Sequence, residues 1–418
     1  MKFGVRESKI MIKSWFKNIG PGPLVAAAFI GPGTVTLCTL AGVNFGYALL
    51  WAMVLSIVAT IVMQEMSARL GIVSQKGLSE IIRTEIKSPL LKSMSIVLIL
   101  LAIVIGNAAY EAGNISGGVL GLEAVLGQHS LVLGSFSLNY FSVAIGLVAF
   151  TLLYIGNYKV LEKALVSLVI LMSIAFMVTA IMTKPNIVEI FKGVMMPKFP
   201  RDSILTIIGL IGTTVVPYNL FLHASLVKEK WKDKSDLKYA RKDTIVAVVL
   251  GGIVSMCIII SAAAVQTSEI NNAADLARGL EPLFGSFSKY FLAIGLFAAG
   301  ITSAITAPLA AAFVATGCLG WSTKMTSKRF KAVWIFILAV GVLSSSSGVK
   351  SIEIIKFAQV ANGVLLPVIA GFLIWIMNKQ SVLGSFKNTM RQNVISLIIL
   401  IITIFLGVKS ILKVFELL

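Results

Sequence analysis

The sequence predicts an all-α integral membrane protein of about eleven transmembrane helices, on the evidence of its composition and of the length of its apolar runs. Of the 418 residues, 57% are hydrophobic and only 13% are charged, and the mean hydropathy is +0.93. Soluble domains carry roughly 25% charged residues. The apolar runs are about 20 residues long, which is enough to cross a hydrocarbon core of roughly 30 Å. Because backbone groups in lipid must bond internally, we predict that these runs are helices.

The distribution of basic residues predicts how these helices cross the membrane. We expect helices at 23–41, 46–68, 94–126, 138–156, 160–182, 203–226, 244–266, 286–317, 331–348, 352–377 and 393–412. Of the 36 Lys and Arg residues, 26 fall in the segments on one side and 7 in the alternate loops. Cytoplasmic loops are enriched in Lys and Arg, so the split predicts a multi-pass protein of the cell membrane with its N-terminus in the cytoplasm and its C-terminus outside. This placement assigns the net charge of +18 to loops beside anionic lipid and argues against nucleic-acid binding.

Two of the apolar runs are interrupted at their centres. The first contains Gly31, Pro32 and Gly33, and the sixth contains Pro217 preceded by Gly209 and Gly212. Proline removes a backbone donor and clashes with the preceding turn, and adjacent glycines let the chain leave helical angles. We therefore expect both helices to be broken near mid-membrane.

The two interrupted helices come first in two successive sets of five. Five is odd, so the second set enters the membrane from the opposite side, and the pattern predicts a five-plus-five inverted repeat. We expect one transmembrane transporter domain over 1–418, with repeat one at about 14–182, repeat two at about 203–377 and an extra helix at about 393–412. Paired broken helices in such repeats mark the substrate site of secondary transporters, because unwound backbone at that depth must line a cavity.

Four stretches of the chain carry a family resemblance. GPGPLVAAAFIGPGTVTLCTLAGVNFGYALLWAMVLSIVATIVMQEMSARLGIVSQKGLSE (20–80) resembles the opening of the natural-resistance-associated macrophage protein (NRAMP) family of divalent-metal transporters. IGTTVVPYNLFLHASLV (211–227), AAGITSAITAPLAAAFVATGCLGW (298–321) and QVANGVLLP (359–367) resemble its sixth, eighth and tenth helices. The resemblance implies a leucine-transporter-like fold with broken helices 1 and 6. For typical members it implies uptake of manganese or iron coupled to protons.

The same resemblance indicates an altered metal site. The family motif Asp-Pro-Gly-Asn is matched by Gly31-Pro32-Gly33-Thr34, and the motif Met-Pro-His is matched by Val216-Pro217-Tyr218. The carboxylate, the amide oxygen and the thioether that hold the metal are therefore absent. A dication needs oxygen or softer ligands with charge compensation, and sulfur favours manganese or iron over harder cations.

The substrate-binding residues that we predict are Gly31, Gly33, Thr34, Thr213, Val216, Tyr218, Asn219 and Gln359. The oxygens of Thr34, Thr213 and Gln359 are the candidate metal ligands. Gln359 matches the glutamine of the family's tenth helix, and His223 matches the second histidine of its sixth.

One acid lies at membrane depth. Glu111 is near the middle of the third predicted helix, with Asn107 and Asn114 on the same face. An intramembrane ionisable residue is a candidate functional site. The resemblance places Glu111 and Asn114 at the Asp and Glu of the family's proton route. Either Glu111, Asn114 and His223 form a proton or charge relay, or Glu111 is hydrogen-bonded to an asparagine and holds helices together.

Three functions fit these residues. The first is a transporter of a divalent cation such as Mn, Fe or partly hydrated Mg²⁺, with protons as the candidate coupling ion. The second is a transporter of a small organic solute such as an amino acid, whose carboxylate the helix start after Gly31 would receive. The third is a scaffold or sensor that does not transport. We predict no cofactor and no enzymatic activity, because no nucleophile–base motif and no phosphate-binding glycine loop is found in the sequence. Among the other acids, Glu65 is predicted to pair with Arg69 four residues later.

Overall fold

The computed structural model describes residues 30–127, 130–133, 136–156, 159–265, 270 and 272–415. The helices of ten or more residues are α3 (Pro32–Phe45), α4 (Leu50–Ser74), α6 (Pro89–Leu100), α7 (Gly106–Leu126), α8 (Tyr140–Ile155), α9 (Lys159–Met182), α11 (Ile204–Thr214), α12 (Pro217–Lys230), α13 (Leu237–Ala263), α16 (Ser288–Leu319), α17 (Lys328–Ser345), α18 (Ser351–Met377) and α20 (Met390–Val414). Residues 23–29 of the first predicted helix and 14–29 of the first predicted repeat lie outside the described residues.

The structure confirms an all-α membrane protein. Over the described part of the chain, eight helical stretches are long and apolar enough to cross a membrane, and α8 is a shorter apolar helix. The segment Pro89–Leu126 forms one such stretch, in which α6 and α7 are joined by a π-helical turn at Leu101–Ile105. Together with α3 and α17, these elements account for the eleven predicted helices in order, although α13 begins at Leu237, seven residues before its expected start at 244, and α4 ends at Ser74, six residues after its expected end at 68.

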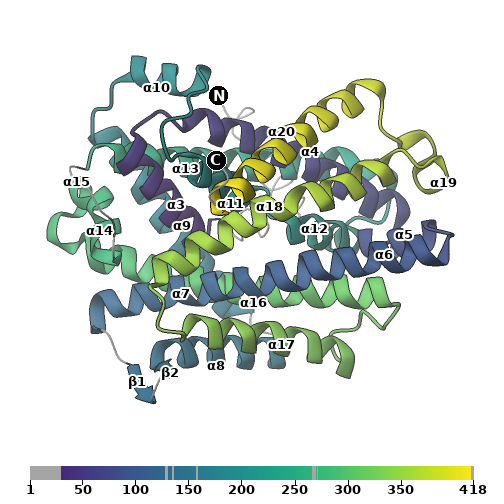
Figure 1. Ribbon diagram of the computed structural model, residues 1–418, viewed down its shortest axis with the longest axis horizontal. Helices are drawn as coiled ribbons and strands as arrows, with labels where there is room; N and C mark the ends of the chain where they lie inside the picture. Colours follow the sequence, from purple (N-terminus) through teal and green to yellow (C-terminus); the bar gives the residue numbers. More distant parts are fainter. Residues whose placement is uncertain are drawn as a thin grey trace, which may run out of the picture.

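The short elements lie at the two ends of the bundle (Figure 1). The helices α5 (Leu78–Glu85) and α19 (Gln380–Leu383) lie at one end. The opposite end carries the hairpin of β1 (Ser130–Leu133) and β2 (Phe136–Asn139), together with α10 (Ile187–Met195) and α14 (Ala273–Ala277). The first group belongs to segments predicted to be cytoplasmic and the second to segments predicted to be outside, so the chain alternates between the ends as expected.

The sixth helix is broken where the sequence predicts. The helix α11 ends at Thr214, Val215 and Val216 leave helical angles with ψ values of 69° and 122°, and α12 begins at Pro217. In a continuous helix the carbonyl of Thr213 would bond to the N–H of residue 217, which proline lacks. The helix α3 likewise begins with a proline, Pro32, after Gly31, whose backbone is extended. Both α3 and α12 thus have proline as their first residue.

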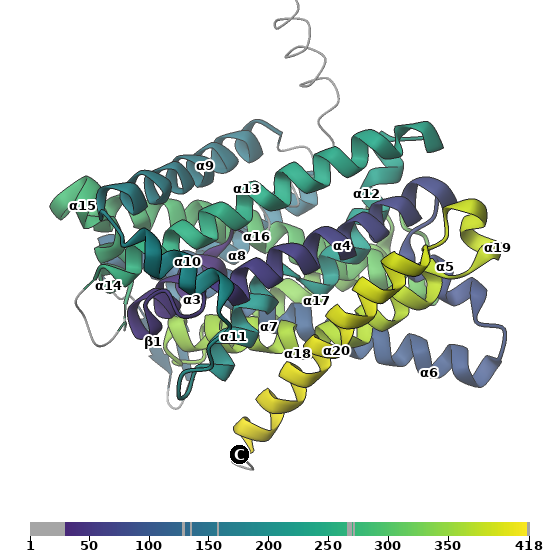
Figure 2. The same ribbon diagram turned by 90° about the horizontal axis from the view of Figure 1, so that it is seen from above.

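Glycines let the α3 helix pack closely against its neighbours. A Cβ placed at Gly117 of α7 would overlap the ring of Pro32, and one placed at Gly42 of α3 would overlap the carbonyl of Ile259 on α13. Backbones can approach this closely only where a side chain is missing, which is how membrane helices pack without a hydrophobic driving force. The start of α3 is therefore held firmly inside the bundle, and α20 lies at its edge along α18 (Figure 2).

The predicted pair of Glu65 and Arg69 is confirmed and belongs to a larger network. Arg69 Nη2 lies 3.1 Å from Glu65 Oε2, and Arg241 of α13 binds the other carboxylate oxygen at 2.8 Å. The Arg69 guanidinium also donates to Asn388 Oδ1 at 2.7 Å and to the carbonyl of Phe386 at 3.0 Å. These contacts tie α4 and α13 to the segment that precedes α20. The sequence predicted only the local pair.

Candidate substrate site between the broken helices

The ends of the two broken helices meet through a pair of threonines. Thr34 lies in the first turn of α3, and Thr213 lies in the last turn of α11. Their Oγ1 atoms are 2.7 Å apart, and both side chains are buried. A positive helix start and a negative helix end therefore lie next to one another at this place. Two hydroxyls that lie 179 residues apart in the sequence thus meet at the ends of two helices.

The side chain of Gln359 covers the start of α3. A Cβ placed at Gly33 would overlap the amide of Gln359, and one placed at Gly212 would overlap the backbone carbonyl of the same residue. Gln359 is on α18 and is 1% exposed. The glycines on α3 and α11 therefore bring both broken helices against one turn of α18.

Two tyrosines form a further wall of the site. Tyr218, the second residue of α12, lies edge to face against Tyr110 of α7, with ring centroids 5.4 Å apart and an interplanar angle of 65°. Both rings are buried, and the side chain of Tyr110 also lies close to Gln359. Such a pair stabilises by roughly 0.5–1.5 kcal/mol beyond its burial. An aromatic surface thus lies where the family resemblance places a histidine.

Several buried polar atoms here have no hydrogen-bonding partner within the described part of the chain. They are both amide atoms of Asn219 and Gln359 Oε1. Leaving such a group unpaired costs about 1–3 kcal/mol each, so native proteins rarely do so without a reason. Their grouping beside the helix ends makes them candidates for binding a ligand or water.

Glu111 is fully buried next to this site. Its Oε2 accepts a hydrogen bond of 3.3 Å from Asn114 Nδ2, whereas its Oε1 has no partner among the described residues. Gly341 of α17 packs on the aliphatic part of Glu111, where a Cβ would be too close to it. Asn107, on the same face, donates instead to the carbonyl of Ala307 on α16 at 2.9 Å. The carboxyl group is near enough to Tyr110 and Tyr218 to interact with them electrostatically.

His223 of α12 is hydrogen-bonded to a residue of α4. Its Nδ1 is hydrogen-bonded to Oε1 of the buried Gln64 on α4, and its Nε2 has no partner in the described structure. The structure gives no direct hydrogen bond between His223 and either Glu111 or Asn114 in the described residues, so the three residues of the predicted relay do not form one continuous chain of side chains.

Sequence reasoning missed some residues of the site. Tyr110 adjoins the predicted Glu111 in the sequence, and Asn362, which is 1% exposed, lies one turn after the predicted Gln359, but neither is among the predicted residues. Gln64 carried no sequence signal beyond being an amide in an apolar run. Long-range partners such as Gln64 and His223 are paired by the tertiary structure alone.

The donor set around the broken helices is neutral. Within the described residues, no group of three or more His, Cys, Asp or Glu could hold a metal ion. The oxygens nearest the break are hydroxyls and amides, and the single acid of the region is Glu111 on α7. Gly31 and Val216 precede the prolines with ordinary extended backbone angles, φ −98° and −73°, and contribute no polar side chain.

Comparisons with known proteins assign the family. The model of the natural resistance-associated macrophage protein-like family matches residues 22–413. The chain belongs to the NRAMP family. A relative from Bacillus subtilis (strain 168), named "Divalent metal cation transporter MntH", is 27% identical over 410 residues, which cover 95% of this chain and 92% of the relative. Another from Dictyostelium discoideum, named "Metal transporter nramp1 homolog", is 28% identical and covers 95% and 75%.

Solved structures confirm the fold. The manganese transporter of Eremococcus coleocola, in complex with an aromatic bis-isothiourea substituted compound, matches with a TM-score of 0.75 and 22% identity over 96% of this chain and 87% of that one. MhsT in complex with L-phenylalanine matches with a TM-score of 0.57 and 15% identity, covering 93% and 98%. This NRAMP chain thus has the leucine-transporter-like fold of membrane transporters, with its sixth helix broken as expected.

Proposed function

We propose that this NRAMP chain is a secondary active transporter that carries a divalent cation, still partly hydrated, through the site between α3, α11 and α18. The observation that carries the proposal is the meeting of Thr34 and Thr213 at the two helix ends, beside the unpartnered Gln359 Oε1. Relatives named as divalent metal cation transporters support the cation. Alternating access would expose this site to each side in turn.

The neutral oxygens favour a cation that keeps part of its water shell. Mg²⁺ dehydrates reluctantly and usually retains several waters, so hydroxyl and amide oxygens can serve as ligands to those waters. The C-terminal end of α11, where the Thr213 carbonyl lacks its helical donor, adds negative potential. Without a carboxylate or a thioether at the two helix starts, dehydrated Mn²⁺ or Fe²⁺ would have neither an anionic nor a soft ligand in direct contact. We therefore propose that the metal site is altered and that its preference has moved toward harder cations.

Glu111 supplies the negative charge in this proposal. Its buried carboxyl group next to Tyr110 and Tyr218 either balances the cation or carries a coupling proton, with Asn114 as its bonded neighbour. We further propose that the described repeats work as one domain in the cell membrane, with the N-terminus in the cytoplasm, as the basic loops predict.

A small organic solute is the second candidate, and a specific observation favours it. The start of α3 has no side-chain cap at Gly31, and its first turn contains no acid that would repel an anionic group. An uncapped helix start binds carboxylates. The aromatic pair of Tyr110 and Tyr218 could then pack against an apolar side chain of the solute.

Flux into proteoliposomes distinguishes these proposals. The purified chain should accumulate Mg²⁺, tested against Mn²⁺ and a panel of amino acids, with and without a pH gradient. Uptake of Mg²⁺ that Mn²⁺ inhibits by competition supports the proposal. Amino-acid flux without cation flux replaces it with the second candidate, and no flux of any kind would indicate a scaffold or sensor.

A further inference from the structure

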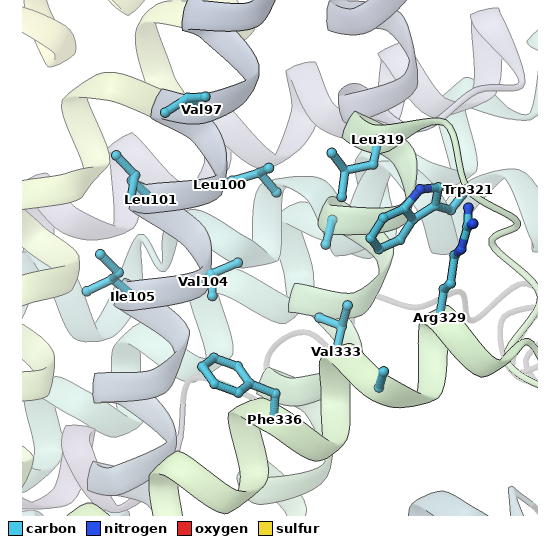
Figure 3. A pocket seen from close by; sticks show the side chains of 12 residues that line it. Val97, Leu100, Leu101, Val104, Ile105, Leu319, Trp321, Arg329, Val333 and Phe336 are labelled. Atoms are coloured by element: carbon cyan, nitrogen blue, oxygen red, sulfur yellow. The ribbon is translucent and has the colours of Figure 1, made fainter.

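An apolar groove lies on the bundle surface away from the substrate site. It has a volume of about 530 Å³ and lies between the first half of the third span and the helices α16 and α17. Figure 3 shows Val97, Leu101 and Ile105 on one wall, with Leu319 and Phe336 on the other. These five side chains are 41–60% exposed, so the groove opens outward. At membrane depth, that opening faces lipid.

The groove results from a divergence of helices. After the π-helical turn, α7 packs tightly against α17, and Gly341 of α17 contacts the side chain of Glu111. Before the π-helical turn at Leu101–Ile105, α6 has no comparable partner on α17. A π-helical turn inserts an extra residue, changes the direction in which side chains point, and is frequent at functional sites. The groove between α6 and α17 is therefore lined by side chains of both helices.

A positively charged side chain, that of Arg329, lies at one end of this apolar groove. Arg329 lines it, and its guanidinium carbon lies 5.0 Å from the ring centroid of Trp321, which also lines it (Figure 3). No carboxylate within the described residues forms an ion pair with Arg329, which is exposed. The segment 320–331 carries Lys324, Lys328 and Lys331 as well, and no acid at all. Tryptophan and arginine at one end of an apolar span are typical of the membrane–water interface.

We propose that this groove is a binding site for one anionic phospholipid of the leaflet that contacts the 320–331 segment. An acyl chain lies between α6 and α17, and the headgroup phosphate pairs with Arg329 where Trp321 orients the guanidinium. The charge pattern selects this occupant, because an apolar cleft with a single-sign cationic end matches a molecule with an apolar tail and an anionic head. The positive-inside distribution predicts that this is the cytoplasmic leaflet.

Native mass spectrometry of the purified full chain tests the proposal. The probes are phosphatidylglycerol and phosphatidylcholine with identical acyl chains, and inorganic phosphate as a competitor. Arg329→Gln is expected to weaken retention of phosphatidylglycerol about fivefold, the change that one cation near an anionic headgroup gives, and to weaken phosphatidylcholine less, because the choline cation offsets the charge of its phosphate. Lys331→Gln is the matched control, because it also removes one positive charge from α17. The ammonium group of Lys331 lies over the ring of Tyr154, which does not line the groove.

A second variant tests the apolar part independently. Ala332 is exposed and lines the groove, so Ala332→Trp fills it and should remove one bound lipid whatever its headgroup. Size-exclusion profiles that match the parent chain establish that each variant is folded. The proposal is overturned if Arg329→Gln and Lys331→Gln have equal effects, or if the lipid is retained without headgroup preference. It is also overturned if Ala332→Trp leaves lipid retention unchanged, or if inorganic phosphate displaces the lipid.

Discussion

Thr34 and Thr213 join the start of one broken helix to the end of another, with their hydroxyl oxygens 2.7 Å apart in a buried site. They come from the two repeats of the chain and contribute neutral oxygens only. A ligand that reaches this place meets backbone, hydroxyl and amide groups, with Glu111 as the nearby acid. The predictions below follow from this arrangement and from the packing around it.

Replacing Thr213 by valine should weaken transport without unfolding the protein. Thr213→Val keeps the shape and removes the hydroxyl, so it removes the bridge to Thr34 and one candidate ligand. A hydrogen bond of this kind contributes about 0.5–1.5 kcal/mol, which corresponds to an increase in KM of up to about tenfold. Initial uptake rates against cation concentration measure it. Thr214→Val is the control, because Thr214 bonds to the carbonyl of Leu210 in its own helix; an equal loss in both would argue against the bridge.

A methyl group at Gly33 should destabilise the site, and shortening Gln359 should rescue it. In Gly33→Ala the new Cβ overlaps the Gln359 amide, and such overpacking typically costs 1–3 kcal/mol. Thermal unfolding in detergent should show a lower midpoint for Gly33→Ala and a recovered midpoint for Gly33→Ala with Gln359→Ala. Gly371→Ala on α18 meets nothing within 4 Å and should leave the midpoint unchanged. A double variant as unstable as Gly33→Ala would refute the contact.

Glu111→Gln distinguishes a relay from a structural carboxyl. The amide keeps the size of the side chain and can still bond to Asn114, but it cannot ionise. If Glu111 carries the coupling proton, flux should continue down a cation gradient and lose its response to a pH gradient. Uptake measured at several external pH values, with and without a gradient, checks this. An unchanged pH response would leave Glu111 with a structural role, and Glu123→Gln, whose partner is Asn139, serves as control.

Returning the absent ligands should restore transport of a softer cation. Gly31→Asp with Val216→Met places a carboxylate and a thioether at the two helix starts, where the extended backbone angles accept both residues. We expect the selectivity for Mn²⁺ over Mg²⁺ to rise, because thioether sulfur favours the softer ion. Competition uptake with both ions measures the ratio. If the double variant leaves the ratio unchanged, the cavity differs in more than its ligands.

Removing Glu65 should destabilise the network that ties α4 and α13 to the segment before α20. Glu65→Ala leaves the guanidinium of Arg69, whose side chain is 3% exposed, without its carboxylate. Breaking a buried pair from one side costs about 3–5 kcal/mol. The thermal unfolding midpoint should therefore fall clearly. Glu189→Ala removes an exposed pair with Lys192 and should leave the midpoint where it was; equal effects would show that burial does not matter here.

The sequence predicted a large part of this architecture from one-dimensional signals. Runs of about 20 apolar residues fix where helices cross, and Pro32 and Pro217 fix where two of them restart, because a missing N–H acts locally. The polar face of Asn107, Glu111 and Asn114 could also be identified, since helical spacing alone places them together. The strands β1 and β2 and the helix α10 were not predicted, although α10 has a local start signal in the cap residue Asn186.

Only the tertiary structure decided which distant residues meet. That Thr34 contacts Thr213, that the Gln359 amide lies on Gly33 and that His223 pairs with Gln64 depends on how rigid helices dock. Helix formation is governed by neighbours three and four residues away, whereas docking sums many weak contacts between segments far apart in the chain. The sequence therefore determined the spans and their breaks, and the packing of glycine-lined helices determined the site.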